Sequence, residues 1–245
     1  MTTSQQLRRN RDFVLFTTGR LLSAGGTSLT SIAYPLLVLE LTHSPSNAGL
    51  VSFARLLPIP IFSLVAGLVA DRHDRRRLMV AADAIRAVAL AALAVLVLVH
   101  PLFWPILLVA FVEGTGDTFF NAAQVGALRS VVATEQLPAA LAVDQARSAG
   151  VSVAGPPVGG ALFTIGHAVP FVVDAASYVA STCFLLAMRR RFQEARERET
   201  ASVRARLADG FRYIWGDPYL RDTTFLYAVG NVTIPGLLLS LVVAA

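Results

Sequence analysis

The sequence predicts an all-α integral membrane protein, and three observations support this fold class. Apolar residues make up 55% of the 245 residues and charged residues only 15%, whereas a soluble domain has about 25% charged residues. Seven long apolar runs follow one another along the chain, and each approaches or exceeds the roughly 20 residues that a membrane-spanning helix needs. All 21 basic residues are arginine, and most of them lie in alternate segments between the runs.

The seven runs are predicted, in chain order, to be helices that cross the membrane. The first run is too long for a cleaved signal peptide, and no small-residue cleavage site follows it. The second run contains Pro58 and Pro60, and the fifth contains Pro156; membrane helices tolerate proline where neighbouring helices satisfy the freed backbone groups. The other four runs combine sufficient length with few charges. The predicted spans are Phe13–Leu41, Ala48–Ala70, Leu78–Val99, Pro105–Val132, Ala139–Ile165, Pro170–Met188 and Thr223–Val243.

One long polar stretch separates the sixth run from the seventh. Its alternating arginine and glutamate residues, as in Arg196–Glu199, are typical of a solvated helix between two membrane units. The sequence therefore predicts three parts. They are a six-helix transmembrane bundle over residues 1–188, a cytoplasmic linker over residues 189–221, and a seventh helix over residues 222–245 that begins a second bundle.

The arginines also predict the topology. The connections after the first, third and fifth runs contain no arginine, whereas residues 8–11, 72–77 and 189–191 are rich in it. Because basic connections stay in the cytoplasm, we expect a multi-pass protein of the cell membrane with a cytoplasmic N-terminus. The lipid bilayer is then a partner, and topology explains the arginines without any nucleic-acid partner.

The composition argues against several kinds of chemistry. Without lysine the chain has no Walker A loop and no Schiff-base nucleophile. Its single cysteine, Cys183, excludes an intrachain disulfide and a thiolate zinc site. The sequence contains no nucleophile–base pattern and no histidine-rich cluster. We therefore expect neither an enzyme, nor a metal site, nor a cofactor.

A short motif marks the end of the second run. Residues 67–77 read Gly-Leu-Val-Ala-Asp-Arg-His-Asp-Arg-Arg-Arg. Gly67 allows a close helix approach, and Asp71 can accept hydrogen bonds from an arginine or from a facing helix N-terminus. This loop resembles the G-x-L-A-D-R-x-G-R-R signature of the major facilitator superfamily. Asp74 replaces the usual glycine, which is similar to the branch that contains the enterobactin exporter and macrolide efflux proteins.

The resemblance implies a fold and a role for the loop. Members of this superfamily have about twelve spans in two six-helix halves, each built from two three-helix inverted repeats. The resemblance also implies that the loop holds the two halves together in one state. The gating residues would be Gly67, Asp71, Arg72, Arg75 and Arg76. This chain corresponds to the first half, the linker and the seventh helix. We therefore expect a fragment or a truncated reading frame, whose missing partner is the C-terminal six-helix half.

A second motif lies in the fifth run. Gly155, Pro156, Gly159 and Gly160 form part of a Gly-Pro-Pro-Val-Gly-Gly sequence, which resembles the G-P-x-x-G-G motif associated with antiporters. Small residues let another helix approach closely, and proline bends the helix axis. A packing kink without any meaning for transport is the alternative interpretation.

Charged residues inside the runs indicate function, because a charge is costly in hydrocarbon. Arg55 and Glu113 both lie roughly 12 Å from the outer surface at about 1.5 Å per residue. Asp117 lies one turn deeper on the same face as Glu113. We expect Glu113 or Asp117 to bind the coupling proton. In the alternative, Glu113 pairs with Arg55, and Asp117 bonds to Asn121 or to a hydroxyl of the first helix.

A second layer of charges lies nearer the cytoplasm, and its signs nearly balance. Asp83 and Arg86 are spaced i,i+3 within the third run, and Asp144 and Arg147 have the same spacing within the fifth. This spacing favours structural pairing within each helix. The layer consists of Arg20, Asp83, Arg86, Asp144 and Arg147. The resemblance implies that the first and fourth helices line a central cavity and that the third and sixth lie outside it.

The first and fourth helices also offer ligand-binding groups. The first helix is rich in hydroxyl side chains, and aromatic and amide groups follow one another on the fourth; this combination suits a bulky, partly apolar ligand. The predicted substrate residues are Thr27, Phe120, Asn121 and Gln124. Packing by small and aromatic residues is the alternative.

The sequence thus favours a secondary active transporter that exports a drug, siderophore or similar amphipathic metabolite, driven by protons. One alternative is the permease subunit of an ATP-driven transporter. The other is a non-transporting membrane scaffold or a truncated fragment.

Overall fold

The computed structural model describes residues 9–188, 212–213, 215–226 and 229–230. The chain divides into two compact units, Met1–Glu194 and Ala195–Ala245. The first unit contains the six predicted spans. In the second unit, residues 218–226 are helical, and the Asp217 carboxylate accepts a hydrogen bond from the Tyr219 backbone N–H at 2.9 Å. Most of the predicted linker and most of the predicted span Thr223–Val243 lie outside the described residues.

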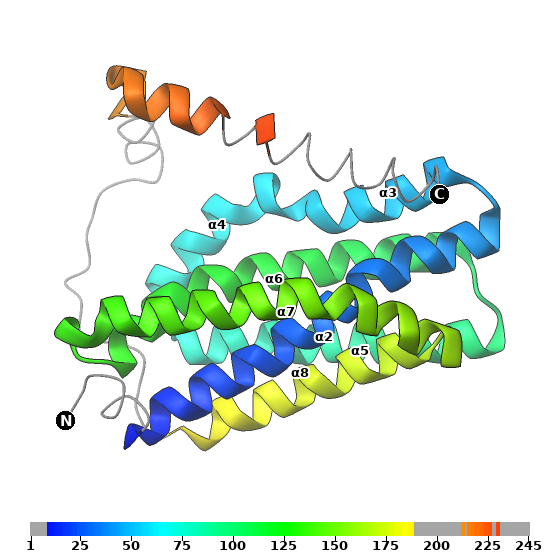
Figure 1. The fold of residues 1–245 in the computed structure, drawn as a ribbon, viewed down its shortest axis with the longest axis horizontal. Helices are drawn as coiled ribbons and strands as arrows, with labels where there is room; N and C mark the ends of the chain where they lie inside the picture. Colours follow the sequence, from blue (N-terminus) through cyan, green and yellow to red (C-terminus); the bar gives the residue numbers. More distant parts are fainter. Residues whose placement is uncertain (1–8, 189–211, 214, 227–228, 231–245) are drawn as a thin grey trace. The chain divides into compact units, whose positions relative to one another are not determined.

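The first unit is a bundle of long helices, and no strand occurs in its described residues (Figure 1). The elements are α2 (Arg11–Thr42), α3 (Pro45–Leu56), α4 (Pro58–Arg72), α5 (Arg75–Val99), α6 (Phe103–Val131), the 3₁₀ turn η1 (Thr134–Gln136), α7 (Leu137–Ile165) and α8 (Val169–Ala187). By length and composition, 6 helical stretches of the described chain are able to cross a membrane. The predicted all-α membrane fold is confirmed.

The second span differs from the continuous run that the sequence suggested. It is divided into α3 and α4 at Leu57, directly before Pro58. Proline has no backbone N–H and clashes with the preceding turn, so the hydrogen-bond ladder of α3 ends there. Leu57 itself keeps a helical conformation (φ −55°, ψ −35°), and α4 therefore continues the span towards Arg72.

Polar side chains define where the helices begin. The side chains of Asn10, Ser44 and Asp74 accept hydrogen bonds from backbone N–H groups in the first turns of α2, α3 and α5, as N-cap residues do. The α2 helix ends at His43, whose left-handed conformation (φ 51°) stops the helix. Asp74 thus starts α5 at the position where the superfamily signature has glycine.

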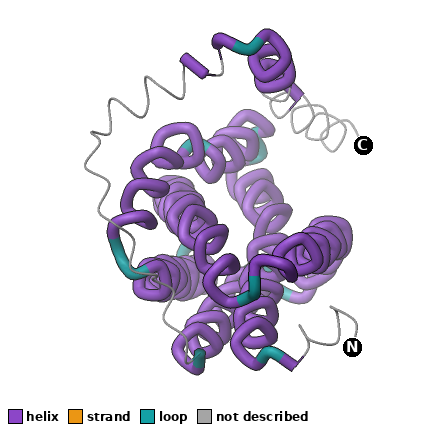
Figure 2. The backbone as a smooth tube through the Cα atoms, turned by 90° about the vertical axis from the view of Figure 1, so that its left-hand side faces the viewer, coloured by secondary structure: helices purple, strands orange, loops and turns teal. Residues whose placement is uncertain are grey.

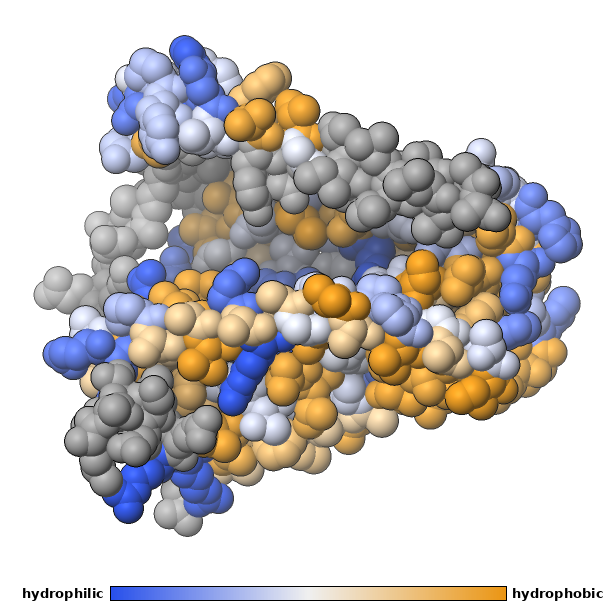
Figure 3. Space-filling model, in the orientation of Figure 1, coloured by the Kyte–Doolittle hydropathy of each residue, from blue (hydrophilic) through white to orange (hydrophobic). Residues whose placement is uncertain are grey.

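The α2 helix lies at the centre of many helix contacts in the bundle. It packs along α8 and α7 and also contacts α3 and α6, while α5 lies between α6 and α8. Figure 2 shows the bundle nearly along the helix axes. Exposed apolar side chains such as Val88, Leu98 and Val153 leave an apolar outer face over much of the bundle (Figure 3), as a lipid environment requires.

Two apolar clusters fill the bundle at its two ends. One contains Phe16, Met79 and Leu128, and the other contains Leu37, Leu90 and Ile106. On α5 and α6 the buried charged residues fall between the segments that supply these clusters. The fold therefore holds a charged layer between two apolar layers.

Candidate functional site

A cavity of about 440 Å³ opens between α2, α3, α6 and α7. Four hydroxyl-bearing residues of α2 line one wall. The α7 helix contributes Ser148, Ser152 and the apolar residues Val151 and Pro156. The wall is therefore mixed, with hydroxyl, amide, aromatic, aliphatic and charged groups in one space.

The four residues predicted to contact substrate all lie on this cavity. Thr27 comes from α2, and Phe120, Asn121 and Gln124 come from α6. The amides form a short chain, because Gln124 donates to Asn121 at 2.7 Å and Asn121 donates to the carboxylate of Asp117 at 2.8 Å. The serines of α7 were missed, although their spacing of four residues places them on one helix face.

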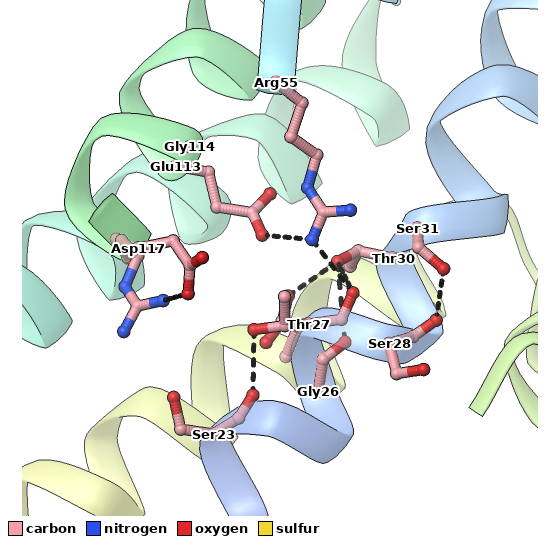
Figure 4. Close-up of polar contacts among 12 residues, drawn as sticks. Ser23, Gly26, Thr27, Ser28, Thr30, Ser31, Arg55, Glu113, Gly114 and Asp117 are labelled. Carbon is pink, nitrogen blue, oxygen red and sulfur yellow. Dashed lines mark hydrogen bonds and ion pairs between the residues drawn. The ribbon is translucent and has the colours of Figure 1, made fainter. Parts of the chain in front are cut away.

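Arg55 and Glu113 meet where α3 crosses α6 (Figure 4). Nη2 of Arg55 lies 3.0 Å from Oε1 of Glu113 and also donates to the backbone oxygen of Thr27 at 3.0 Å. The Glu113 side chain is 1% exposed, whereas Arg55 reaches the cavity wall. Arg55 thus faces the cavity, and Glu113 lies behind it and outside the cavity lining.

Two neighbours hold this ion pair in place. The Tyr178 hydroxyl of α8 donates to Oε1 of Glu113 at 3.2 Å and lies 2.8 Å from the Thr27 hydroxyl. Gly114 lets α3 approach, because a Cβ atom there would overlap the backbone oxygen of Arg55. Tyr178 was not among the predicted site residues, because its partners Glu113 and Thr27 lie on two other helices.

Arg86 joins α5 to α6 and corrects the predicted layering. It pairs with Asp83 on its own helix, as expected, and also with Asp117 at 3.3 Å. Its guanidinium lies 4.2 Å from the centre of the Tyr178 ring, an arrangement that favours a cation. Asp117, which is 38% exposed, therefore connects the cavity wall to a buried arginine, and Arg86 does not belong to a separate inner layer.

The predicted pairing of Asp144 with Arg147 is wrong. Asp144 of α7 forms its ion pair with Arg20 of α2, and Arg147 is exposed. A helix turn brings i and i+3 residues to one face, but the packing of α2 against α7 offers Asp144 a closer partner. Arg20 lines the cavity, so this pair connects the cavity wall to α7.

The predicted gating loop keeps its charges near the surface. Asp71 and Arg75 lie 3.6 Å apart, Arg72 is exposed, and Arg76 donates to the backbone oxygen of Leu186 in α8. Gly67 does not provide a close approach in this structure, because a Cβ atom there would have no neighbour within 4 Å.

A different glycine accommodates the loop arginine. Gly126 of α6 faces the Arg75 guanidinium so closely that an added Cβ atom would overlap it. The sequence motif around Gly67 gives no indication of this contact on another helix.

The glycines of the α7 motif differ in their surroundings: Gly155 and Gly159 lie against α2, whereas Gly160 does not. A Cβ atom on Gly155 would overlap the Ser28 side chain, and one on Gly159 would overlap the backbone of Leu29. A Cβ atom on Gly160 would have no neighbour within 4 Å. Pro156 lies inside the helix and lines the cavity. Two of the motif's glycines thus bring α7 onto α2.

Comparison with known sequences agrees with this architecture. The profile of the family described as "Transmembrane secretion effector" matches residues 4–238. The multidrug efflux pump Tap of Mycolicibacterium fortuitum is 29% identical over 221 residues, which cover 86% of this chain and 54% of that protein. Tap of Mycobacterium tuberculosis is 26% identical over 85% of this chain and 51% of its own length.

A third relative is the macrolide efflux protein A of Streptococcus pyogenes. It is 27% identical over 140 residues, or 56% of this chain and 35% of that protein. The names of all three relatives describe efflux proteins rather than enzymes. The chain spans about half the length of the Tap proteins it matches.

Proposed function

Because the chain belongs to the transmembrane secretion effector family of the major facilitator superfamily, we propose that it acts in the secondary active efflux of a small amphipathic molecule. The relatives named as multidrug and macrolide efflux proteins support a drug-like substrate. In this proposal the cavity between α2, α3, α6 and α7 is the part of the substrate site that this chain supplies.

The composition of the cavity wall is the observation that supports the proposal best. Its volume of about 440 Å³ falls in the range of about 300–1,000 Å³ typical of small-molecule sites. Phe120, Val151 and Pro156 offer apolar surface, while Asn121 and Gln124 offer amide groups. A ligand with an apolar body and a few polar groups would satisfy both kinds of wall.

Proton coupling is assigned to Asp117 in preference to Glu113. Both acids were candidates in the sequence, but Glu113 is buried behind Arg55, whereas the Asp117 carboxylate is partly exposed on the cavity wall. A proton that enters the cavity would neutralise Asp117 and weaken its pairing with Arg86. The Asn121 amide, which now donates to Asp117, would then be freer to contact substrate.

The remaining assignments follow from the family. The loop residues Gly67, Asp71, Arg72, Arg75 and Arg76 are proposed to gate the cytoplasmic side, and the N-terminus is proposed to be cytoplasmic. The partner of the bundle would be a second six-helix half. The three-part division into a bundle, a linker and a seventh helix belongs to the same proposal.

Ligand binding tests the proposal directly. The purified chain in lipid nanodiscs should bind a radiolabelled macrolide saturably. Asn121→Leu should lower the affinity about tenfold, since it removes a hydrogen bond worth about 1–1.5 kcal/mol. Gln145→Leu is the matched control, because Gln145 is exposed on α7 and does not line the cavity. Absent binding, or equal losses in both variants, would refute the substrate site.

Transport provides the second test. In a bacterial host without its own drug pumps, the chain co-expressed with a second six-helix half should lower macrolide accumulation, and a protonophore should abolish the effect. Full proton-driven efflux by the Glu113→Gln, Asp117→Asn double variant would exclude both acids as the coupling site.

A further inference from the structure

Asp174 is a buried acid that the substrate cavity does not use. It lies on α8 with 0% exposure and faces α2 across Gly26, where an added Cβ atom would overlap the carboxylate. Oδ2 accepts a hydrogen bond from the Thr30 hydroxyl at 2.8 Å, and Oδ1 lies 3.2 Å from Oγ of Ser177. Among the described residues, no arginine or histidine forms an ion pair with it.

The hydroxyl groups around Asp174 supply too few hydrogens for a carboxylate. Each hydroxyl has a single hydrogen to donate. Oγ of Ser177 lies 2.7 Å from the backbone oxygen of Asp174, and this shorter contact uses its hydrogen. The contact between Oγ of Ser177 and Oδ1 then lacks a hydrogen unless the carboxyl group itself provides one.

The charged groups around Asp174 also indicate that its carboxyl group carries a proton. The titratable groups around Asp174 come from α2, α3, α5, α6 and its own helix. They are Tyr34, Arg55, Arg86, Glu113 and Tyr178. On α7, Asp144 is already paired with Arg20, and Arg147 is exposed.

Both neighbouring arginines already have acidic partners. Arg55 pairs with Glu113, and Arg86 pairs with Asp83 and Asp117. The cluster therefore holds two guanidinium groups and, with Asp174, four carboxyl groups. Because an unpaired charge is costly in a buried site, the acid without an arginine is the one that would be neutral.

We propose that Asp174 is a proton-binding site, protonated in this conformation, with its Oδ1–H donating to Ser177 and its Oδ2 accepting from Thr30. The site is linked to the ion pair on the cavity wall. Oγ1 of Thr30, whose hydrogen goes to Oδ2, lies 3.1 Å from the backbone oxygen of Thr27, and that oxygen accepts a hydrogen bond from Arg55. Loss of the proton would place a second negative charge near Glu113 and in competition with it for Arg55.

The proposal does not depend on transport, so infrared spectroscopy can test it in the purified chain. The carbonyl-stretching band of a protonated carboxyl group should be present at neutral pH in an ester-free maltoside detergent. Asp174→Asn should remove this band, and asparagine offers a similar shape with an NH2 donor group and a carbonyl acceptor, which favours folding. Asp117→Asn, in which Arg86 keeps Asp83 as its partner, and Glu135→Gln, at an exposed acid, are controls that should leave the band intact.

A second variant covers the case in which Asp174→Asn does not fold. Thr30→Val removes the hydrogen bond to Oδ2 and should move the band to higher frequency. The proposal is overturned by a missing band in the unmodified chain, by a band that persists in Asp174→Asn, or by an unshifted band in Thr30→Val. Failure of macrolide binding would refute the substrate site but would leave these spectra unchanged.

Discussion

Two adjacent glycines of α7 allow a matched test of how the bundle packs. In the structure, a Cβ atom on Gly159 would lie 2.9 Å from the backbone carbonyl carbon of Leu29 in α2 and would overlap its oxygen. A Cβ atom on Gly160 would have no neighbour within 4 Å. Gly159→Ala and Gly160→Ala therefore make the same chemical change on the same helix in opposite surroundings.

The two variants should change the free energy of unfolding in opposite directions. Alanine in place of a mid-helix glycine raises the free energy of unfolding by about 0.5–1 kcal/mol. Gly160→Ala should show this gain alone, because its Cβ atom meets no neighbour. Overpacking costs about 1–3 kcal/mol, and the Leu29 backbone cannot rotate away as a side chain can. Gly159→Ala should therefore be destabilised by up to about 2.5 kcal/mol, and the two variants should differ by about 1–3 kcal/mol.

Thermal unfolding followed by size-exclusion chromatography measures this difference. At about 2–4 °C per kcal/mol for a chain of this size, the midpoints should be separated by several degrees, with Gly160→Ala the higher. Equal midpoints, or a lower midpoint for Gly160→Ala, would refute the close packing of α7 on α2 at Gly159.

Three further predictions follow from the site. Asp74→Ala should lower stability by about 1 kcal/mol because α5 loses its N-cap, while Asp74→Asn, which preserves a capping oxygen, should stay near the unmodified chain in the same unfolding assay. Glu113→Gln should destabilise by about 1–3 kcal/mol, because Arg55 loses its charged partner; an unchanged midpoint would contradict the structural role of this pair. Binding of a cationic drug should weaken in Asp117→Asn because the cavity wall loses a carboxylate, whereas a neutral drug should lose less affinity; equal losses for both drugs would exclude Asp117 as the cation contact.

The sequence predicted the helices well because each span depends on local composition. A run of apolar residues about as long as the membrane is thick forms a helix whatever its neighbours are. The residues predicted to contact substrate, Thr27, Phe120, Asn121 and Gln124, lie on one cavity, as their polar and aromatic character on two helices suggested. The break at Pro58 was less visible, since a membrane helix tolerates proline with or without a division.

The partner of each charged side chain was harder to predict than its depth in the membrane. Rise per residue gives the depth of a charge, and it put Arg55 and Glu113 at one level. It does not give the rotation of one helix relative to another, and this rotation decides between Arg20 and Arg147 as the partner of Asp144. Partners from distant helices, such as Asp117 for Arg86, require the packed structure.

The spacing of small and acidic residues on α6 explains why the charges meet where they do. Glu113 and Asp117 stand one turn apart, and Gly114 and Gly116 lie between them. Gly114 admits the backbone of α3 at Arg55, and Gly116 admits the side-chain stem of Arg86 from α5. Each acid thus receives an arginine from a different neighbouring helix.

Because α6 also supplies both amide side chains of the cavity wall, Asn121 and Gln124, a ligand that displaces the Asp117 carboxylate would act on α5 through Arg86. A shift of α3 would instead break the pair between Arg55 and Glu113. One turn of α6 therefore connects the cavity wall to two helices through two separate ion pairs, Arg55 with Glu113 and Arg86 with Asp117.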